Sequence, residues 1–421
     1  MTLQAEVISI GDELTSGQRL DTNSQWLSER LGEIGIGVLY HTTVADDLKA
    51  NLRVFQEAVR RADVVVASGG LGPTADDLTR EVLARLTHTE LIRDEAVVEH
   101  IRGLFARFGR EMPERNVVQA LFPAGSRVIP NPAGTAPGVA LEVPREGAAA
   151  SRVYALPGVP AEMYQMWHAT VGPELAALSG GTRMIRHQRI KCFGISESEL
   201  EQRLPDLIRR GRTPSVGITV SAATITLRIT AAGATPEECH AAMAPTAATI
   251  RECLGTIVFG DEDDEMEHAV ARLLAERGKT LATVEWGTGG MVADRLHEVC
   301  AASGNYLGGL VVPTQQALTR LLGVPAELIA THTAVSGEVA AAMATGCRER
   351  LAADLALAVS GFPETGARDD QPQRLFVALA SDQGVAVRSA PHFGHPEILK
   401  TRAAKQALNL VRLTLLEEIN T

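Results

Sequence analysis

A glycine-rich segment that ends in two carboxylates, residues 68–77, holds the strongest chemical signal in the sequence (Ser-Gly-Gly-Leu-Gly-Pro-Thr-Ala-Asp-Asp). Glycines let a backbone come close to a ligand and offer N–H groups to phosphate oxygens. Asp76 and Asp77 would repel a bare phosphate, so the pair favours a divalent metal ion between carboxylates and phosphate. A tight turn followed by a two-Asp helix start is the alternative interpretation.

The elements on either side of this segment suit a phosphate site. Residues 63–67 include a β-branched run that predicts a buried strand, and residues 78–86 predict an amphipathic helix. The N-terminus of such a helix carries the end of the helix dipole that attracts an anion. The pattern therefore predicts a strand, a glycine-rich turn, a carboxylate pair and a helix, in that order.

A second pair of carboxylates follows the first predicted strand. Residues 5–10 form that strand, Asp12 and Glu13 come soon after it, and Asn23 lies at the start of the next predicted helix. Ligands of open α/β sheets bind at the carboxyl ends of the strands. Asp12 and Glu13 therefore join the later carboxylate pair only if the two strands are neighbours. By itself, a Gly-Asp-Glu sequence is also typical of a solvated turn.

Two later loops are expected at the same place. Residues 131–138 form a rigid, glycine-rich loop that contains Gly134 and Thr135. Residues 154–163 predict a strand, a proline-fixed turn and a helix with Glu162 in its first turn. Each loop alone is compatible with a purely structural role. Several such loops after apolar runs are better explained by one binding cleft.

The alternation of strands and helices predicts the fold class. A strand over residues 38–44 and a helix over residues 48–61 lie between the first strand and the glycine-rich turn. Such alternation favours right-handed βαβ units and a mainly parallel sheet. We therefore expect an α/β protein.

Length and composition exclude several classes of protein. A chain of 421 residues, 45% of them hydrophobic, suggests roughly two to four globular domains. The net charge of −11 argues against a general nucleic-acid surface, and 4% aromatic residues weaken a base-stacking hypothesis. We expect no bilayer-spanning segment and no signal peptide. The five scattered cysteines contain no C-x-x-C pair and suit reduced thiols in the cytoplasm.

Taken in order, these motifs resemble the CinA family. They lie at residues 10–14, 21–23, 69–79, 134–138 and 157–163. The resemblance implies a three-layer α/β/α domain, similar to molybdopterin-binding domains, at the N-terminus. It also implies a small α+β linking module and a C-terminal α/β CinA domain. The expected boundaries are 1–175, 181–260 and 262–421.

The resemblance further implies an activity for the N-terminal domain. In CinA-like proteins this domain is associated with metal-dependent hydrolysis of the pyrophosphate of ADP-ribose, which yields AMP and ribose 5-phosphate. A carboxylate-held metal both neutralises phosphate charge and activates a water molecule near neutral pH. We expect Asp76, Asp77 and Asp12 to hold Mg²⁺, Mn²⁺ or Co²⁺, with Glu13 as a further ligand or water-positioning group. The expected substrate contacts are Gly69, Gly70, Gly72, Thr74, Asn23, Gly134, Thr135 and Glu162.

Three later motifs suit structural roles. Ser196 and Glu199 fit a capping box at the start of a helix. The acidic run at residues 261–265 has the composition of a metal site, but it better suits the start of a helix over residues 266–277. The glycines of residues 287–290 lack the full spacing of a dinucleotide-binding turn.

The C-terminal domain resembles the nicotinamide-nucleotide amidohydrolase domain of the same family, but with substituted positions. Where that pattern has Ser, Tyr, Asn and Lys, this chain has Trp286, Pro313, Gln315 and Leu318. Amide hydrolysis by this route needs an activated nucleophile. We therefore expect no deamidation of nicotinamide mononucleotide, and a role for this domain in dimerisation or partner contact.

Three kinds of function remain open on the sequence. The first is a hydrolase that acts on a small-molecule nucleotide, either ADP-ribose or a relative such as a flavin dinucleotide. The second is a module that binds a pterin or nucleotide without turnover. The third is an interaction protein in competence or DNA repair, with a protein of the recombination machinery as its partner. We expect a homodimer without membrane association or direct nucleic-acid contact.

Overall fold

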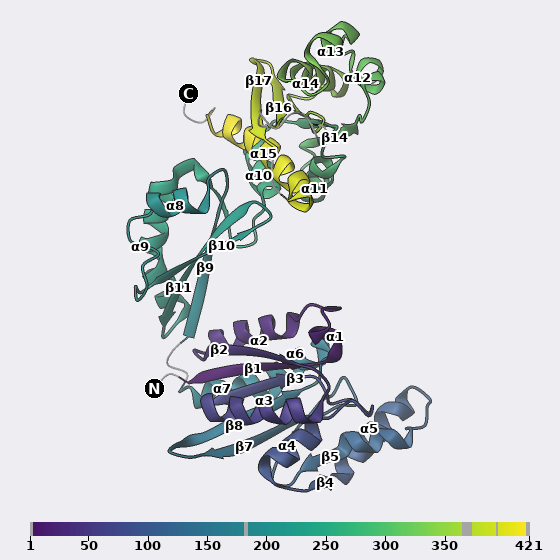
Figure 1. Ribbon diagram of the computed structural model, residues 1–421, viewed down its shortest axis with the longest axis vertical. Coiled ribbons are helices and arrows are strands. Elements are labelled where there is room, and N and C mark those ends of the chain that lie inside the picture. The colour runs from purple at the N-terminus through teal and green to yellow at the C-terminus, as the bar shows by residue number, and fades with distance from the viewer. Residues whose placement is uncertain (1–2, 181–183, 364–372, 393–394, 418–421) are drawn as a thin grey trace. The chain divides into compact units, whose positions relative to one another are not determined.

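The computed structural model describes residues 3–180, 184–363, 373–392 and 395–417 (Figure 1). The chain divides into two compact units. The first comprises Met1–Arg186 with Ala231–Ala242, and the second comprises His187–Thr230 with Met243–Thr421. Within the described part of the chain, no helix combines the length and the apolar composition that crossing a membrane requires.

The first unit is built on a six-stranded sheet with the strand order β2-β1-β3-β8-β7-β6. Strand β1 pairs in parallel with both β2 and β3, and β3 pairs in parallel with β8. Strands β7 and β6 extend the sheet in antiparallel fashion. The strands are β1 (Gln4–Ile10), β2 (Gly37–Val44), β3 (Val64–Ser68), β6 (Arg127–Ile129), β7 (Gly138–Arg145) and β8 (Ala148–Leu156).

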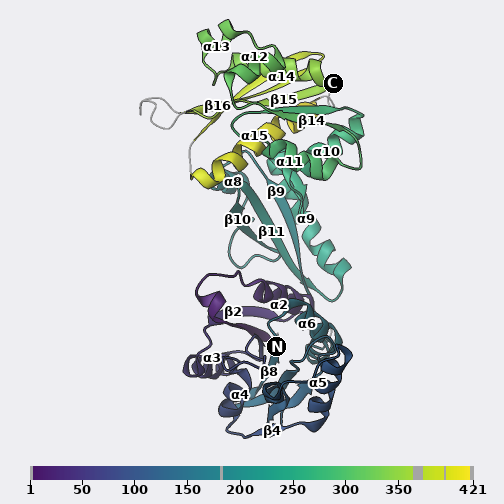
Figure 2. The same cartoon turned by 90° about the vertical axis from the view of Figure 1, so that its right-hand side faces the viewer.

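Helices cover both faces of this sheet (Figures 1 and 2). Its main helices are α2 (Thr22–Glu33), α3 (Leu48–Arg61), α4 (Thr79–Thr87), α6 (Pro160–Met166) and α7 (Gly172–Leu178). Shorter or peripheral elements are α1 (Asp12–Thr15), β4 (Leu91–Arg93), α5 (Glu95–Arg107), the 3₁₀-helix η1 (Glu114–Ala120), β5 (Leu121–Pro123) and the π-helix η2 (Trp167–Val171).

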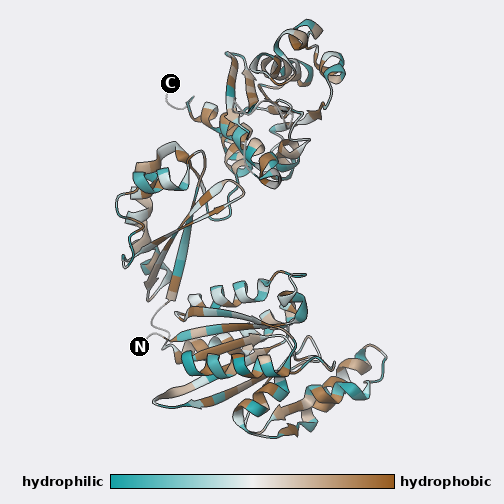
Figure 3. Ribbon diagram, viewed as in Figure 1, coloured by the Kyte–Doolittle hydropathy of each residue, from teal (hydrophilic) through white to brown (hydrophobic). Residues whose placement is uncertain are grey.

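Alternate residues of the central strands enter two separate cores, as a pleated sheet between two layers requires. Ile8 and Val65 pack with α3 and α4, whereas Val7 and Val64 pack with α2, α6 and α7. In Figure 3 the strands are mainly hydrophobic and the helices alternate in character. The predicted three-layer α/β/α fold is confirmed.

The middle segment forms a four-stranded sheet with the order β10-β11-β9-β12. Its elements are β9 (Met184–Cys192), α8 (Glu197–Arg203), β10 (Ser215–Ser221), β11 (Thr224–Gly233), α9 (Pro236–Leu254), η3 (Gly255–Ile257) and β12 (Val258–Asp261). Ser196 caps α8 by accepting the N–H of Glu199 at 3.3 Å, which is the serine half of the predicted capping box.

The C-terminal part of the second unit is again layered, around a five-stranded sheet with the order β14-β13-β15-β16-β17. Helices α10, α11 and α15 share one core with the sheet, and α12, α13 and α14 share the other. The strands are β13 (Leu281–Glu285), β14 (Tyr306–Val311), β15 (Leu355–Val359), β16 (Arg374–Ser381) and β17 (Gly384–Pro391). The helices are α10 (Met266–Arg277), α11 (Met291–Cys300), α12 (Gln315–Leu322), α13 (Ala326–His332), α14 (Gly337–Leu351) and α15 (Pro396–Glu417).

Helix α15 fastens the middle segment to the C-terminal sheet within the second unit. Lys405 is 1% exposed, and its ammonium group lies 2.7 Å from Glu265 Oε2. The same group donates a hydrogen bond to the buried Thr224 Oγ1 at 2.6 Å. Further along the same helix, Arg412 donates to the backbone carbonyls of Thr256 and Val258. Two buried cations, Lys405 and Arg412, thus take part in the contact between α15 and the middle segment.

We predict that Glu265→Gln lowers the stability of the full chain by about 2 kcal/mol, because it leaves the buried Lys405 charge without its counterion. The amide still accepts the hydrogen bond that caps α10, so loss of the cap does not contribute. Lys405→Met removes the charge and fills the same volume, and it should cost less than Glu265→Gln. Denaturant unfolding measures both values. A larger loss in Lys405→Met would contradict this account of the ion pair.

Candidate active site

One edge of the first sheet collects every residue predicted to act on substrate. Strands β1, β2, β3 and β8 run in parallel, so the loops that follow them leave from the same edge. Strand β7 runs antiparallel, with Val139 opposite Ala155 near the end of β8. The loop of residues 131–138, which enters β7, therefore reaches that edge as well. The condition placed on Asp12 and Glu13, that β1 and β3 be neighbours, holds.

The first two glycines of the turn allow the chain to pass close to its own neighbours. Gly69 has φ of +114°, and a Cβ there would lie 2.3 Å from the backbone oxygen of Ile10. Gly70 has φ of +65°, and a Cβ there would lie 2.3 Å from Thr79 Oγ1. These conformations and contacts exclude a side chain. Both glycines are thus required by the joint between β1, β3 and α4, in addition to any contact with a ligand.

Asp77 closes the glycine-rich loop. Its carboxylate accepts the backbone N–H groups of Gly72 at 2.7 Å and Thr74 at 2.9 Å, together with the Thr74 hydroxyl. These are the donors that the sequence assigns to phosphate. A phosphate that used them would replace the carboxylate of Asp77. In this conformation Asp77 holds the loop rather than facing a ligand.

A buried arginine under the loop is a feature that the sequence analysis did not identify. Arg80 is 4% exposed and donates to the carbonyl oxygen of Leu71 at 2.8 Å. Burial lowers the pKa of its guanidinium to about 10, and the charge of Asp77 acts in the opposite direction. The group remains a cation at neutral pH. Its place three residues after Asp77, in the first turn of α4, is the sequence signal that could have indicated it.

Four carboxylates gather beside the loop, and one of them was also missed. The N–H of Asp12 donates to Asp46 Oδ2 at 2.9 Å, and the N–H of Asp46 donates to Asp12 Oδ1 at 3.1 Å. Burial raises the pKa of the Asp46 carboxyl, the hydrogen bond from Asp12 acts against this, and the charges of Asp12, Asp76 and Glu13 raise it further. Asp46 follows the end of β2, so its position after a parallel strand was the available signal.

The donor set fits a divalent cation in its chemistry, since carboxylate oxygens are the ligands that Mg²⁺ and Mn²⁺ prefer. The mutual repulsion around Asp46 is also what a bound cation would relieve. In the described residues, no group of three or more His, Cys, Asp or Glu has the arrangement of a metal site. The predicted ligands Asp76, Asp77 and Asp12 therefore surround the same loop without forming a ready-made coordination set.

The remaining predicted residues line the edge at two further points. Asn23 donates from Nδ2 to Ser68 Oγ at 2.8 Å and to the Gly158 oxygen at 3.0 Å. Glu162 accepts a hydrogen bond of 2.6 Å from Asn131 Nδ2 and lies against Gly134, where a Cβ would be 2.2 Å from its carboxylate. Glu162 thus braces the 131–138 loop. Thr135 is half-buried within that loop.

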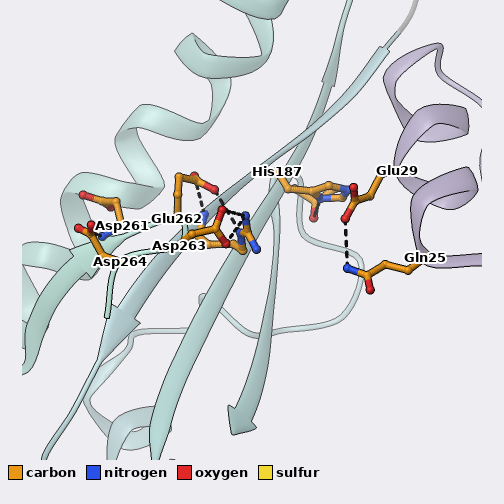
Figure 4. Close-up of polar contacts among 9 residues, drawn as sticks. Gln25, Glu29, His187, Asp261, Glu262, Asp263 and Asp264 are labelled. Carbon is orange, nitrogen blue, oxygen red and sulfur yellow. Dashed lines mark hydrogen bonds and ion pairs between the residues drawn. The ribbon is translucent and has the colours of Figure 1, made fainter. Parts of the chain in front are cut away.

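The carboxylates of the acidic run between the middle segment and α10 form ion pairs with arginines. Glu262 and Asp263, both labelled in Figure 4, contact Arg189 at 3.2 and 3.1 Å. Asp264 contacts Arg272 at 2.9 Å. Glu265 then caps α10. The predicted helix start is confirmed.

The substituted positions of the C-terminal domain lie at the end of β13 and around α12. Leu318 is 0% exposed and belongs to the core, whereas Pro313 and Gln315 are exposed. Trp286 packs at the edge of that core. The buried Glu285 carboxylate accepts hydrogen bonds from Thr288 Oγ1 and from the backbone N–H groups of residues 290, 292 and 293, so it caps α11.

A cleft of about 1080 Å³ in the second unit lies elsewhere. It is bounded by β16, β17, α15 and the start of α8, and none of the four substituted positions lines it. This cleft is therefore not the place where the family pattern has its deamidase residues.

Comparison with known proteins identifies the family. The probable molybdopterin binding domain matches residues 6–177, the damage-inducible protein CinA KH domain matches residues 187–260, and the CinA C-terminal domain matches residues 263–415. A protein of Symbiobacterium thermophilum, named as a competence-damage inducible protein, is 40% identical, and the alignment covers 98% of this chain and 99% of that one. The chain belongs to the CinA family. A CinA-like protein of Geobacter metallireducens is 38% identical over 98% of this chain and 100% of its own length.

A solved CinA structure is also similar in sequence. The protein CinA from Thermoplasma acidophilum, whose function is described as unknown, is 34% identical and covers 41% of this chain and 98% of its own, with a TM-score of 0.37. A score of this size supports no functional conclusion. The family resemblance expected from the motifs is confirmed, and it extends over the whole CinA arrangement of segments.

We predict that Asp46→Asn stabilises the CinA chain by about 0.5 kcal/mol at pH 7 in the presence of a chelator. The amide still accepts from Asp12, while the cost of burying the charge and the repulsion from neighbouring carboxylates are both removed; solvent screening keeps both effects small. Because the folded pKa of Asp46 is raised, the gain is complete above that pKa and disappears below the unfolded value. Thermal unfolding across the acidic range measures it. A variant less stable than wild type at pH 7 would contradict the repulsion.

Proposed function

We propose that the N-terminal domain of this CinA-family protein is a metal-dependent hydrolase of nucleotide pyrophosphates, with ADP-ribose cleaved to AMP and ribose 5-phosphate. The observation that carries the proposal is the gathering of Asp12, Glu13, Asp46 and Asp76 beside a glycine-rich loop. That loop leads into the N-terminus of α4. A divalent cation held by these carboxylates would let a phosphate bind beside them.

Each group has a separate task in this proposal. Asp12 and Asp76, with Asp46 beside them, would hold the cation, which supplies charge neutralisation and a more acidic water molecule. Glu13 accepts a proton from the water as its oxygen attacks phosphorus. The bond from that phosphorus to the bridging oxygen breaks, and AMP and ribose 5-phosphate leave. Arg80 under the loop and the dipole of α4 favour the phosphate charge.

The C-terminal domain is proposed to lack deamidase activity. A lysine at position 318 would have to emerge from a fully buried core site that Leu318 fills. Position 286 offers an indole instead of a nucleophile, and the nearby Thr288 hydroxyl is committed to Glu285 at 2.6 Å. We propose that this domain instead supports a homodimer or contacts a protein of the recombination machinery. Light scattering of the full chain and of a chain without this domain tests the dimer.

A second candidate is a module that binds a pterin or nucleotide without turnover. It is favoured by the way Asp77 already occupies the N–H groups of Gly72 and Thr74. A closed loop of this kind could open for a ligand and still lack a coordinated cation. Tight nucleotide binding without release of AMP would support this alternative.

We predict that Asp76→Ala lowers kcat for metal-dependent release of AMP from ADP-ribose by about 100-fold or more. The carboxylate is exposed to solvent, so the midpoint of unfolding should change little. Asp77→Ala should lower both activity and stability, because three hydrogen bonds of the loop are lost. Steady-state kinetics and unfolding curves separate the two. Retention of most activity in Asp76→Ala would argue against the proposed role.

For the C-terminal domain, the expected result with nicotinamide mononucleotide is the absence of the deamidated product. Mass spectrometry of the full chain at high enzyme concentration provides the readout. Turnover that is abolished by Thr288→Val would overturn the proposal and identify that hydroxyl as the nucleophile.

A further inference from the structure

The peptide unit that joins Leu71 to Gly72 in the glycine-rich loop is held on both sides by charged residues. On its carbonyl side, the Arg80 guanidinium donates to the Leu71 oxygen at 2.8 Å. The same guanidinium donates more weakly to the next carbonyl oxygen, that of Gly72, at 3.5 Å. On the N–H side, Gly72 donates to Asp77 Oδ1 at 2.7 Å. A cation and a carboxylate thus hold opposite ends of one peptide unit.

The peptide units before it are held from the same helix. Thr79 Oγ1 donates to the carbonyl oxygen of Gly69 at 2.9 Å, and the Thr79 N–H donates to that of Gly70 at 3.1 Å. With the bond from Arg80, three successive loop carbonyls accept from two neighbouring residues at the start of α4. Because a trans peptide unit is planar, its N–H points opposite to its carbonyl. The N–H groups of residues 70–72 are therefore turned away from the residues that hold these carbonyls.

The buried charge of Arg80 is costly for a contact that only shapes the loop. Arg80 is 4% exposed, and its Nε has no hydrogen-bond partner among the residues that the structure describes. A buried cation is destabilising unless an opposite charge compensates it. In this conformation the charge of Asp77 acts on the guanidinium. A phosphate in the place of that carboxylate would compensate the cation more strongly, because it carries more negative charge.

Other charges near the loop act on an anion as well. The four carboxylates gathered beside the loop oppose it, so a divalent cation has to accompany the anion. Arg19 is an exposed cation at a small cavity that Glu13 also lines. Arg80 differs from Arg19 in that its guanidinium binds the carbonyls of the loop itself.

We propose that Arg80 is a positioning residue of the phosphate-binding loop. By holding the Leu71 carbonyl, it keeps the Gly72 N–H directed at the anion when a phosphate replaces the Asp77 carboxylate. Arg80 acts through the loop backbone and does not touch the ligand, which is a nucleotide pyrophosphate accompanied by a divalent cation. This role rests on the proposed function for the identity of the ligand, and its test measures binding and backbone protection.

Calorimetric titration of the full chain with inorganic pyrophosphate and Mg²⁺, together with hydrogen exchange measured by mass spectrometry, tests the proposal. Arg80→Met removes the guanidinium and should lower the affinity for pyrophosphate about tenfold. The amides of residues 69–74 should exchange about tenfold faster in this variant, while β3 exchanges as in wild type. Arg80→Lys keeps the charge and a donor for the Leu71 carbonyl, so it should recover most of both losses.

Arg85→Met is the matched control. It removes an exposed arginine of the same helix, which pairs with Glu81. Its affinity for pyrophosphate and its loop exchange should stay within about twofold of wild type, because exposed ion pairs contribute little.

In wild type, saturating pyrophosphate should slow exchange in residues 69–74, and unchanged exchange would overturn the inference without any variant. A folded Arg80→Met chain with wild-type affinity would also overturn it. So would a loss of affinity with unchanged loop exchange, because Arg80 would then act only through its charge. The hydrolase is tested separately, since Arg80-dependent binding without release of AMP from ADP-ribose would contradict the hydrolase alone.

Discussion

The parallel pairing of β1 with β3 is the constraint on which the N-terminal site depends. Ser9 lies opposite Ser68, so the chain segments that follow both strands leave the sheet side by side. The joint tolerates no side chain at Gly69, since the backbone oxygen of Ile10 occupies that space. Strand β2 on the other flank of β1 adds Asp46. Carboxylates that are far apart in sequence thereby lie close together, as the reciprocal hydrogen bonds of Asp12 and Asp46 show.

The sequence predicted the layered fold because its signals were local and strong: β-branched runs, amphipathic helices, and glycine-containing turns between them. It could not predict which hydrogen bonds the loop would make. Asp76 and Asp77 are adjacent and of the same type, so the sequence does not distinguish their roles. The hydrogen bonds of Asp77 in the folded chain show that it closes the loop. Arg80 and Asp46 were missed for a similar reason. An arginine in a helix and an aspartate after a strand are common in sequence. Only the tertiary structure shows that Arg80 is buried and that Asp46 pairs with Asp12. Helix α11 begins only at Met291, because Gly289 and Gly290 before it adopt positive φ.

The second unit repeats the layered design but distributes its polar groups differently. At the end of β13, the Glu285 carboxylate caps α11. The substituted positions near it are Trp286, Pro313 and the buried Leu318. Two further buried polar groups lie in α15, where Lys405 and Arg412 connect the C-terminal sheet with the middle segment. The second unit thus uses these polar groups to cap a helix and to connect its segments.

The most direct test of this account is mass spectrometry of the products that the full-length protein forms from ADP-ribose, with Mg²⁺, Mn²⁺ or Co²⁺ and with a chelator. Flavin dinucleotide and nicotinamide mononucleotide would be offered in parallel. We expect AMP together with ribose 5-phosphate only when a metal is present, and no deamidated mononucleotide. Equal release of AMP in the chelator, or tight binding of ADP-ribose without any product, would contradict the claim that the carboxylates beside the glycine-rich loop hold a catalytic cation.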